Sequence, residues 1–269
     1  MEHWPSVDKF VCISLREATE RRRSVQLEFD RVGLKVHFII SDRPANSNGY
    51  YGCYTSHQKA LRQAKDEGLK RICVFEDDLY FLDVKKVHEA ASIFERFAST
   101  TQWDAFLLGW YPLRAEKTSD KDVLRVLCGG QAHAYIANTR LIQRGLPDVS
   151  PESPREVDMF MFCSDCAEDK RYLRTANCST QLEVFALRRM IALQPMDTTS
   201  IVSTKAKLRQ RLLVTKLFPP DMLQHIVVYI PTLHFCILSA VMLFLTVAAV
   251  VGFTFYGCWL LARSNQNKG

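Results

Sequence analysis

The pattern of apolar and polar residues predicts strands that alternate with helices through most of the chain. Short apolar runs typical of buried strands lie at residues 9–15, 36–40, 72–75 and 105–108. Between them, apolar residues recur at intervals of three or four, which is the spacing of one helix face. Helices are therefore expected over residues 18–32, 55–67 and 85–97, with Thr55 or Ser56 capping the second. This order favours an α/β fold, and the strand–helix–strand pattern at residues 9–40 predicts a parallel β–α–β unit.

The later pattern predicts shorter elements. Residues 124–128 and 134–137 are expected to form two short strands, and the charged residues 114–122 a mobile loop. A short helix should begin at Val157. Further strands are expected at residues 182–187 and 191–193.

Three consecutive carboxylates directly follow the run at residues 72–75. We call Glu76, Asp77 and Asp78 the acidic triplet. Acids at the end of a buried strand are costly unless a cation neutralises them. Oxygen ligands of this kind suit Mn²⁺ or Mg²⁺, and ligands of open α/β sheets bind beyond the carboxyl ends of the strands. The triplet therefore indicates a metal site, and a solvated acidic turn is the alternative.

The C-terminal part of the chain has the composition of a membrane anchor. No charged residue occurs at residues 235–261, and a helical span needs about 20 apolar residues. A hairpin that begins near Ile226 and turns at Pro231, or a buried core helix, are the alternatives. The net charge is +6, and much of the excess lies at residues 205–216, where anionic lipid is the expected partner rather than nucleic acid.

These features divide the chain into a catalytic domain, a basic juxtamembrane linker, a transmembrane segment and a tail, expected at residues 1–203, 204–225, 226–262 and 263–269. Five basic residues precede the span and two follow it, so the positive-inside rule predicts a single-pass anchor with a cytosolic catalytic domain. The ER or Golgi lumen is the alternative. The nine cysteines are unevenly spaced and do not suggest a disulfide framework. Cys163 and Cys166 have zinc-site spacing but lack a second pair.

Several motifs in order resemble glycosyltransferase family 25, the lipooligosaccharide and collagen galactosyltransferase-like group. The leading one is Gly52-Cys53-x-x-Ser56-His57 upstream of the acidic triplet. The other fragments that match are Ile13–Leu15 with Arg21-Arg22, Trp103–Gly109, Ala132–Tyr135, Val157-Asp158 and Ala192–Pro195. The resemblance covers roughly residues 9–203. It implies a GT-A-like (Rossmann-like) fold with a mixed sheet flanked by helices, Mn²⁺ or Mg²⁺, and a nucleotide-sugar donor such as a UDP-hexose.

On this resemblance the triplet takes the part of the family's metal-binding acids. Asp78 is then the main metal ligand, Asp77 supports it, and Glu76 contacts the ribose or a metal-bound water. The metal would neutralise the departing diphosphate. Asp158 is the candidate general base, because an inverting transfer needs a separate carboxylate near the acceptor hydroxyl. A helix N-cap is its alternative role.

The remaining candidates follow from the same motifs. His133 would complete the metal shell or contact the diphosphate, or else be a structural histidine. Ser56 and His57 would orient their loop against the donor or simply pack. Arg22, with Arg21, would pair with phosphates or lie on a solvated helix face. Ser14 stands where the family usually has asparagine and is carried over as a donor contact.

The expected function is transfer of galactose or glucose from the nucleotide sugar to a hydroxyl of a glycan, lipid-linked or protein acceptor. One alternative is a degenerate transferase-like domain that serves as a membrane-tethered binding or scaffold module. A metal-dependent nuclease is weaker, because the basic residues are juxtamembrane rather than around the acids.

Overall fold

The structure is a computed structural model that describes residues 4–44, 49–99, 102–152, 157–162 and 182–194. The chain separates into two units, Met1–Val228 and Tyr229–Gly269, and every described element belongs to the first. No helix among the described residues is long and apolar enough to span a membrane. The expected anchor at residues 226–262, the linker before it and the Cys163–Cys166 pair lie outside the described residues.

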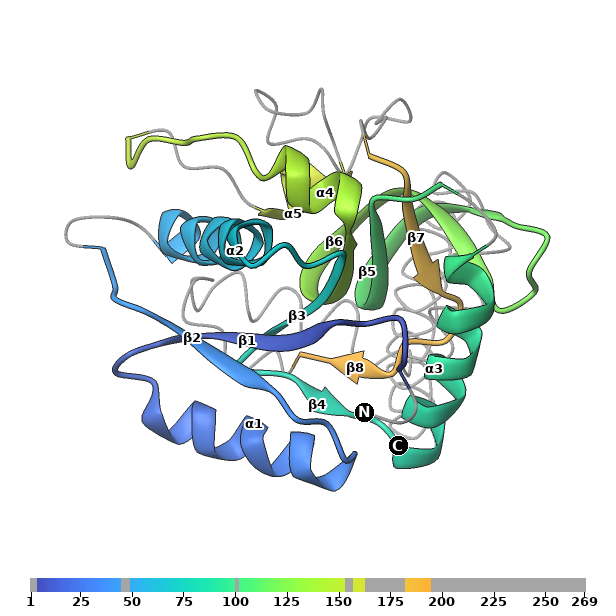
Figure 1. Cartoon of the computed structure of the whole chain (residues 1–269), viewed down its shortest axis with the longest axis horizontal. Coiled ribbons are helices and arrows are strands. Elements are labelled where there is room, and N and C mark those ends of the chain that lie inside the picture. The colour runs from blue at the N-terminus through green and yellow to red at the C-terminus, as the bar shows by residue number, and fades with distance from the viewer. Residues whose placement is uncertain (1–3, 45–48, 100–101, 153–156, 163–181, 195–269) are drawn as a thin grey trace, which may run out of the picture. The chain divides into compact units, whose positions relative to one another are not determined.

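The described part of the chain is built on one mixed sheet. Its strands are β1 (Lys9–Leu15), β2 (His37–Ser41), β3 (Arg71–Glu76), β5 (Ala105–Lys117), β6 (Val123–Asn138) and β7 (Val184–Leu187). They lie in the order β2-β1-β3-β6-β5-β7 (Figure 1). β1 is parallel to β2 and β3, whereas β6 is antiparallel to β3 and β5. The sheet confirms the predicted α/β class.

Helices cover both faces of this sheet. They are α1 (Thr19–Arg31), α2 (Gly49–Asp66), α3 (Val84–Ala98), α4 (Thr139–Arg144) and α5 (Val157–Phe162). α1 and α2 lie on opposite sides of the sheet (Figure 1). Phe29 of α1 packs with Phe75 in one core, and Tyr54 of α2 packs with Val74 in the other. The alternation of side chains along β3 thus supplies both cores.

The predicted β–α–β unit is present at the start of the chain. β1 has the predicted bounds, and Gly33 ends the helical segment with a φ of 70°, a conformation that favours glycine. β1 and β2 then pair in parallel, from Val11 with His37 to Leu15 with Ser41. The carboxyl ends of β1 and β3 therefore point to the same edge of the sheet, where the acidic triplet begins.

The predicted cap of the second helix was wrong. α2 begins at Gly49, so Thr55 and Ser56 lie inside it. Their hydroxyls donate to helix carbonyls, Thr55 Oγ1 to Tyr51 O at 2.9 Å and Ser56 Oγ to Gly52 O at 2.7 Å. A serine or threonine can satisfy its hydroxyl within a helix as well as at its start, and the residue type alone does not separate the two.

The strands after the triplet are longer than predicted. The expected loop at residues 114–122 is strand up to Lys117, and the two expected short strands form the continuous β6. Shifts of register interrupt the β5–β6 pairing, and such bulges break the two-residue alternation on which the prediction depended. Gly109 in this region admits close packing, because a Cβ there would lie 2.2 Å from Ala192 O.

A short second sheet completes the layout. β4 (Tyr80–Phe81) pairs antiparallel with β8 (Ala192–Leu193) just after the acidic triplet. The pairing places Gln194, the residue that follows β8, beside the acids despite its distance in sequence. The late strands predicted at residues 182–187 and 191–193 correspond to β7 and β8.

Candidate functional site

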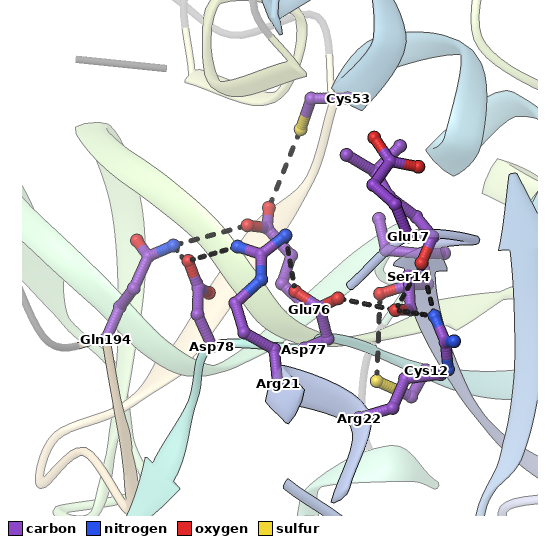
Figure 2. Close-up of polar contacts among 12 residues, drawn as sticks. Cys12, Ser14, Glu17, Arg21, Arg22, Cys53, Glu76, Asp77, Asp78 and Gln194 are labelled. Atoms are coloured by element: carbon purple, nitrogen blue, oxygen red, sulfur yellow. Dashed lines mark hydrogen bonds and ion pairs between the residues drawn. The ribbon is translucent and has the colours of Figure 1, made fainter. Parts of the chain in front are cut away.

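The acidic triplet lies in a pocket at the carboxyl end of β3. The pocket holds about 80 Å³, room for several water molecules or a hydrated ion. We call it the β3 pocket. Its lining comes from the end of β1, from α1, from the segment after β2, from the start of α2, from the triplet itself and from the residue after β8: Ile13, Ser14, Leu15, Arg21, Arg43, Pro44, Gly49, Gly52, Cys53, Ser56, Glu76, Asp77, Asp78 and Gln194. Figure 2 shows the polar contacts among its main residues.

Glu76 ends β3 and faces α2. Its Oε1 lies 3.2 Å from His57 Nε2, and its Oε2 accepts from Gln194 Nε2 at 3.3 Å. His57 is buried, and its Nδ1 lies 3.1 Å from the Tyr135 hydroxyl. Burial raises the pKa of Glu76, but the hydrogen bond and charge of His57 outweigh it and leave the pKa below its usual value. Glu76 is therefore the triplet member most readily ionised.

Asp77 points from the triplet toward β1. Its Oδ2 accepts from Ser14 Oγ at 2.5 Å, and its Oδ1 lies 3.2 Å from an Arg21 guanidinium nitrogen. Burial raises the pKa of Asp77, although the Ser14 hydrogen bond and the Arg21 charge act in the opposite direction. Asp77 thus links the triplet to β1 and α1.

Asp78 is the most strongly perturbed of the three acids. Gln194 Nε2 donates to its Oδ1 at 2.8 Å, and Arg21 lies 3.7 Å from its Oδ2 (Figure 2). Burial and then the negative charge of Glu76 raise the pKa of Asp78 to about 7. A carboxyl group that resists ionisation at neutral pH indicates that the positive charge around it does not balance the nearby carboxylates.

Arg21 supplies part of the positive charge that balances the acidic triplet. Replacing Arg21 with alanine should lower the Tm in metal-free buffer, and the decrease relative to the unaltered protein should be larger at pH 8 than at pH 5. Arg21 lowers the pKa of both aspartates, so its loss raises their folded-state pKa further. An acid whose folded-state pKa is raised loses stability as the pH climbs from the unfolded value of about 4 through the folded value.

The matched control for this prediction is Arg23→Ala, which removes an exposed arginine from the same helix. Thermal unfolding at the two pH values measures both variants. An Arg21→Ala deficit of the same size at pH 5 and pH 8 would contradict the electrostatic role of Arg21.

Three other predicted donor contacts lie at the same edge of the sheet. Ser14 and Ser56 both line the β3 pocket. Arg22 turns toward the main chain: it donates to Ser14 Oγ at 3.1 Å, to Arg16 O at 2.8 Å and also to Leu15 O. Arg22 therefore holds the turn after β1, whereas its neighbour Arg21 meets the acids.

Asp158 lies in the first turn of α5 and is bound to β6. Its two oxygens accept from Gln131 N at 2.6 Å and from Ala132 N at 2.9 Å. Gln131 has a φ of 64°, so the carboxylate holds an unusual backbone turn. Burial raises the pKa of Asp158, although the Gln131 amide acts to lower it. Asp158 is not part of the lining of the β3 pocket, but the charge of Glu76 reaches it.

His133 is also buried behind the pocket. Its Nε2 lies 3.1 Å from Ala192 O, and among the described residues its Nδ1 has no hydrogen-bond partner. Burial lowers the pKa of His133. The histidine that contacts the triplet is instead His57, so the structure brings His57 to the acids and places His133 against β8.

Sequence reasoning gave no role to Cys53, Tyr135 and Gln194. Cys53 Sγ lies 3.8 Å from Glu76 Oε1, and Tyr135 and Gln194 form the contacts described above. Cys53 and Gln194 fall within the motifs that resemble the family, but only the fold shows that they meet the triplet. Arg21 was considered only alongside Arg22, because adjacent helical residues cannot be separated by pattern when both are partly exposed.

A part of the chain that contains the acidic triplet is similar to a known protein family. Residues 42–125 match the family model for glycosyltransferase family 25 (LPS biosynthesis protein). This confirms the resemblance predicted from the motifs, since the matched segment contains both Gly52–His57 and the acidic triplet. No curated protein matches the sequence.

Solved structures give more distant similarities. A197 from STIV is 12% identical with a TM-score of 0.36, over 66% of this chain and 80% of that one. A glycosyltransferase involved in the glycosylation of the major capsid of PBCV-1 is 6% identical with a TM-score of 0.32, over 51% of this chain and 63% of that one. Mannose-1-phosphate geranyltransferase from Thermus thermophilus is 10% identical with a TM-score of 0.39, over 66% of this chain and 72% of that one.

The family match covers part of the acidic pocket. The motif helix α2 and the triplet after β3 both lie within residues 42–125, and the two meet at the contact between His57 and Glu76. Residues 42–125 are therefore similar to glycosyltransferase family 25, and this similarity supports glycosyltransferase activity for the chain.

Proposed function

We propose that the chain transfers a hexose, galactose or glucose, from a nucleotide-sugar donor to an acceptor hydroxyl, with Mn²⁺ or Mg²⁺ at the acidic triplet. The observation that carries this proposal is the charge of the β3 pocket. Three carboxylates converge there, and the pKa of Asp78 rises to about 7 because burial and Glu76 disfavour its charge. A divalent cation would relieve that cost.

The donor atoms fit such a cation. The carboxylates of Glu76 and Asp78 offer hard oxygen ligands, which Mn²⁺ and Mg²⁺ prefer. Asp78 and Glu76 would hold the metal, and Asp77 would support them through its hydrogen bond to Ser14. When bound, the metal would neutralise the negative charge of the departing diphosphate.

Other residues of the β3 pocket have proposed roles in binding the donor and in positioning the acids. Arg21 lines the pocket with a side chain that is 27% exposed, so its guanidinium can reach both the aspartates and a donor phosphate. Gln194 fixes the spacing of Glu76 and Asp78 by donating to both. Ser14 and Ser56 are the proposed polar contacts to the donor. His57, anchored by Tyr135, holds Glu76 in its ionised form.

The proposed general base is Asp158. Burial raises its pKa, which makes it a better proton acceptor than an ordinary aspartate. Two backbone amides fix the orientation of its carboxylate and leave further lone pairs for an acceptor hydroxyl. We also retain His133 as a proposed contact to the diphosphate, supported by its Nδ1, which no described residue satisfies.

The finer fold assignment is part of the same proposal. The mixed sheet with parallel β1, β2 and β3, and an acidic motif at the end of β3, is consistent with a GT-A-like arrangement. Ligands in such sheets bind at the carboxyl edge, which is where the β3 pocket opens.

Thermal unfolding with Mn²⁺, with UDP and with both tests the binding part of this proposal. The pair is expected to raise the Tm by about 5 °C or more, and each component alone by less, since a ligand that binds only the native state stabilises it. Asp78→Asn serves as the control and should remove the effect of the pair. Equal shifts for the variant and the unaltered protein would refute a metal site at the triplet.

We further propose that residues 226–262 anchor the chain in a membrane and that residues 204–225 form the basic linker before the anchor. The support is the uncharged stretch at residues 235–261 and the basic residues that precede it. The charge distribution favours a cytosolic catalytic domain, residues 1–203. Protection of an N-terminal tag from protease in sealed microsomes would overturn that orientation and favour the ER or Golgi lumen.

A further inference from the structure

Cys53, His57 and Glu76 form a second cluster of metal-ligand types at the edge of the β3 pocket. Their ligand atoms all lie within 4.8 Å of one another. Glu76 Oε1 lies 3.2 Å from His57 Nε2 and 3.8 Å from Cys53 Sγ. A thiol, an imidazole and a carboxylate form a different donor set from the oxygen ligands at Asp78, because sulfur and imidazole favour softer cations.

The spacing of these atoms resembles that of a tetrahedral zinc site. Bond lengths of about 2.0–2.3 Å at the tetrahedral angle place a nitrogen–oxygen pair about 3.3–3.5 Å apart and a sulfur–oxygen pair about 3.5–3.7 Å apart. The observed nitrogen–oxygen distance of 3.2 Å and sulfur–oxygen distance of 3.8 Å each lie close to these values. These two pairs would therefore need shifts of only a few tenths of an ångström to bind a cation, and the Cys53 and His57 ligand atoms lie within 4.8 Å of each other.

The three ligands are held by regular elements. Cys53 and His57 are four residues apart in α2, so both face the same side of the helix, and Glu76 ends β3. His57 Nδ1 lies 3.1 Å from the Tyr135 hydroxyl, with the two rings stacked at 5.7 Å. Such a hydrogen bond at the other ring nitrogen is the usual support of a metal-bound histidine. Nε2 is thereby directed toward Glu76.

The cluster also has access to solvent. Cys53 and Glu76 line the β3 pocket, and buried His57 lies behind them. Figure 2 shows the Cys53 sulfur directed at the Glu76 carboxylate. A cation entering from the pocket would meet these two ligands first and would keep its fourth position open toward the pocket.

We propose that Cys53, His57 and Glu76 form a binding site for a thiophilic divalent cation of the zinc class, next to the hard-cation site at Asp78 and sharing Glu76 with it. Binding displaces the thiol proton of Cys53 and any proton on His57 Nε2, and these protons leave to solvent, so cation binding is accompanied by proton release. The thiolate, the neutral imidazole and the carboxylate supply three ligands, and water supplies the fourth.

The site has a consequence for catalysis that rests on the proposed function. Glu76 belongs to both sites, so a zinc-class cation on its Oε1 competes with the role of Glu76 beside Asp78. Zn²⁺ is then expected to inhibit UDP release in the presence of saturating Mn²⁺, and Cys53→Ser to relieve that inhibition.

Cobalt binding to the full-length protein tests the site without any assay of activity. Co²⁺ is added to reduced protein, and the near-ultraviolet charge-transfer band of a cobalt–thiolate bond is recorded together with the visible bands of tetrahedral Co²⁺. The unaltered protein should show both signals at one equivalent, and Zn²⁺ should abolish them. Cys53→Ser should lose the charge-transfer band.

Two controls separate this site from other thiols. Cys73→Ser changes another buried cysteine that packs in the core on the opposite face of β3 from Val74, and it should keep the band. A Cys163→Ser, Cys166→Ser double variant should also keep it. Circular dichroism of each variant verifies that the fold is retained.

The outcomes distinguish this inference from the proposed function. A band that persists in folded Cys53→Ser, or one that disappears only in the Cys163–Cys166 variant, overturns the site. So does the absence of any cobalt–thiolate signal in the unaltered protein. None of these results depends on whether Mn²⁺ and UDP bind at Asp78.

Discussion

Replacing Asp78 with asparagine is expected to lower the rate of UDP release from a nucleotide-sugar donor by about 100-fold to 1,000-fold. Removal of one group that stabilises transition-state charge has effects of this size in other enzymes. Asp78 is the buried acid whose pKa is raised to about 7 by burial and by Glu76. A cation bound there would relieve the electrostatic cost of ionising it. UDP release at saturating Mn²⁺ measures the effect.

The same substitution should stabilise the metal-free protein above pH 7. The folded-state pKa of Asp78 is about 7 against an unfolded value near 4, so its contribution to stability is lost as the pH rises between those values. Asparagine avoids that loss, which is on the order of a few kcal/mol. Below pH 4 the two proteins should unfold at similar temperatures. Loss of activity together with a gain of stability is typical of an acid retained for function.

Asp83→Asn is the matched control for both measurements. Asp83 caps α3 by accepting from Lys85 N at 2.8 Å, and asparagine is an equally good cap. Because the helix cap is retained, the activity of the Asp83→Asn variant should stay within about two-fold of the unaltered protein. If Asp78→Asn retains activity at the level of this control, Asp78 is not the metal ligand.

Replacing Asp158 with asparagine is expected to reduce kcat by about 100-fold to 10,000-fold, the usual contribution of a general base. The amide oxygen can still accept from one of the two β6 amides, so the protein should remain folded. Asp158→Ala would leave both amides without an acceptor and lower the free energy of unfolding by about 1–3 kcal/mol for each. Single-turnover kinetics, with thermal unfolding in parallel, separate the two effects.

Glu152→Gln, which changes an exposed acid earlier in the same part of the chain, is the control for Asp158. A folded Asp158→Asn protein with unchanged kcat would show that Asp158 only holds the turn at Gln131 and Ala132. Another group would then have to accept the proton from the acceptor hydroxyl.

The local pattern of apolar and polar residues was sufficient to predict most elements in the N-terminal part of the fold. The apolar runs at β1 and β3 and the helical spacing in α1 and α3 identified these elements within one or two residues. The apolar run of β3 also showed that the acidic triplet begins at its carboxyl end. These features depend on near neighbours in sequence, which is why periodicity detects them.

The pattern failed where long-range packing sets the structure. Bulges in the β5–β6 pairing concealed two long strands, and the six-residue α4 (Thr139–Arg144) is too short for a helical repeat to be recognised. The two long strands form because of their pairing with each other across the sheet rather than because of their local sequence alone.

The site shows the same division. The triplet and the Gly52–His57 motif were recognised from local sequence, and His57 does contact Glu76. Gln194 donates to Asp78 across 116 residues of chain, a contact that local sequence does not reveal. Arg22 and His133 were assigned by motif position, whereas the fold turns the first to backbone carbonyls and the second to Ala192.

Release of UDP from a panel of UDP-hexoses, measured by mass spectrometry with and without Mn²⁺, tests the central claim most directly. UDP-galactose and UDP-glucose are the expected donors, and omission of Mn²⁺ or addition of a chelator should suppress the release. Asp78→Asn and Asp83→Asn serve as the paired variants. UDP release from at least one donor, dependent on both Mn²⁺ and Asp78, is the predicted result. Silence of the folded protein across the panel, or release that persists without metal, would contradict the account.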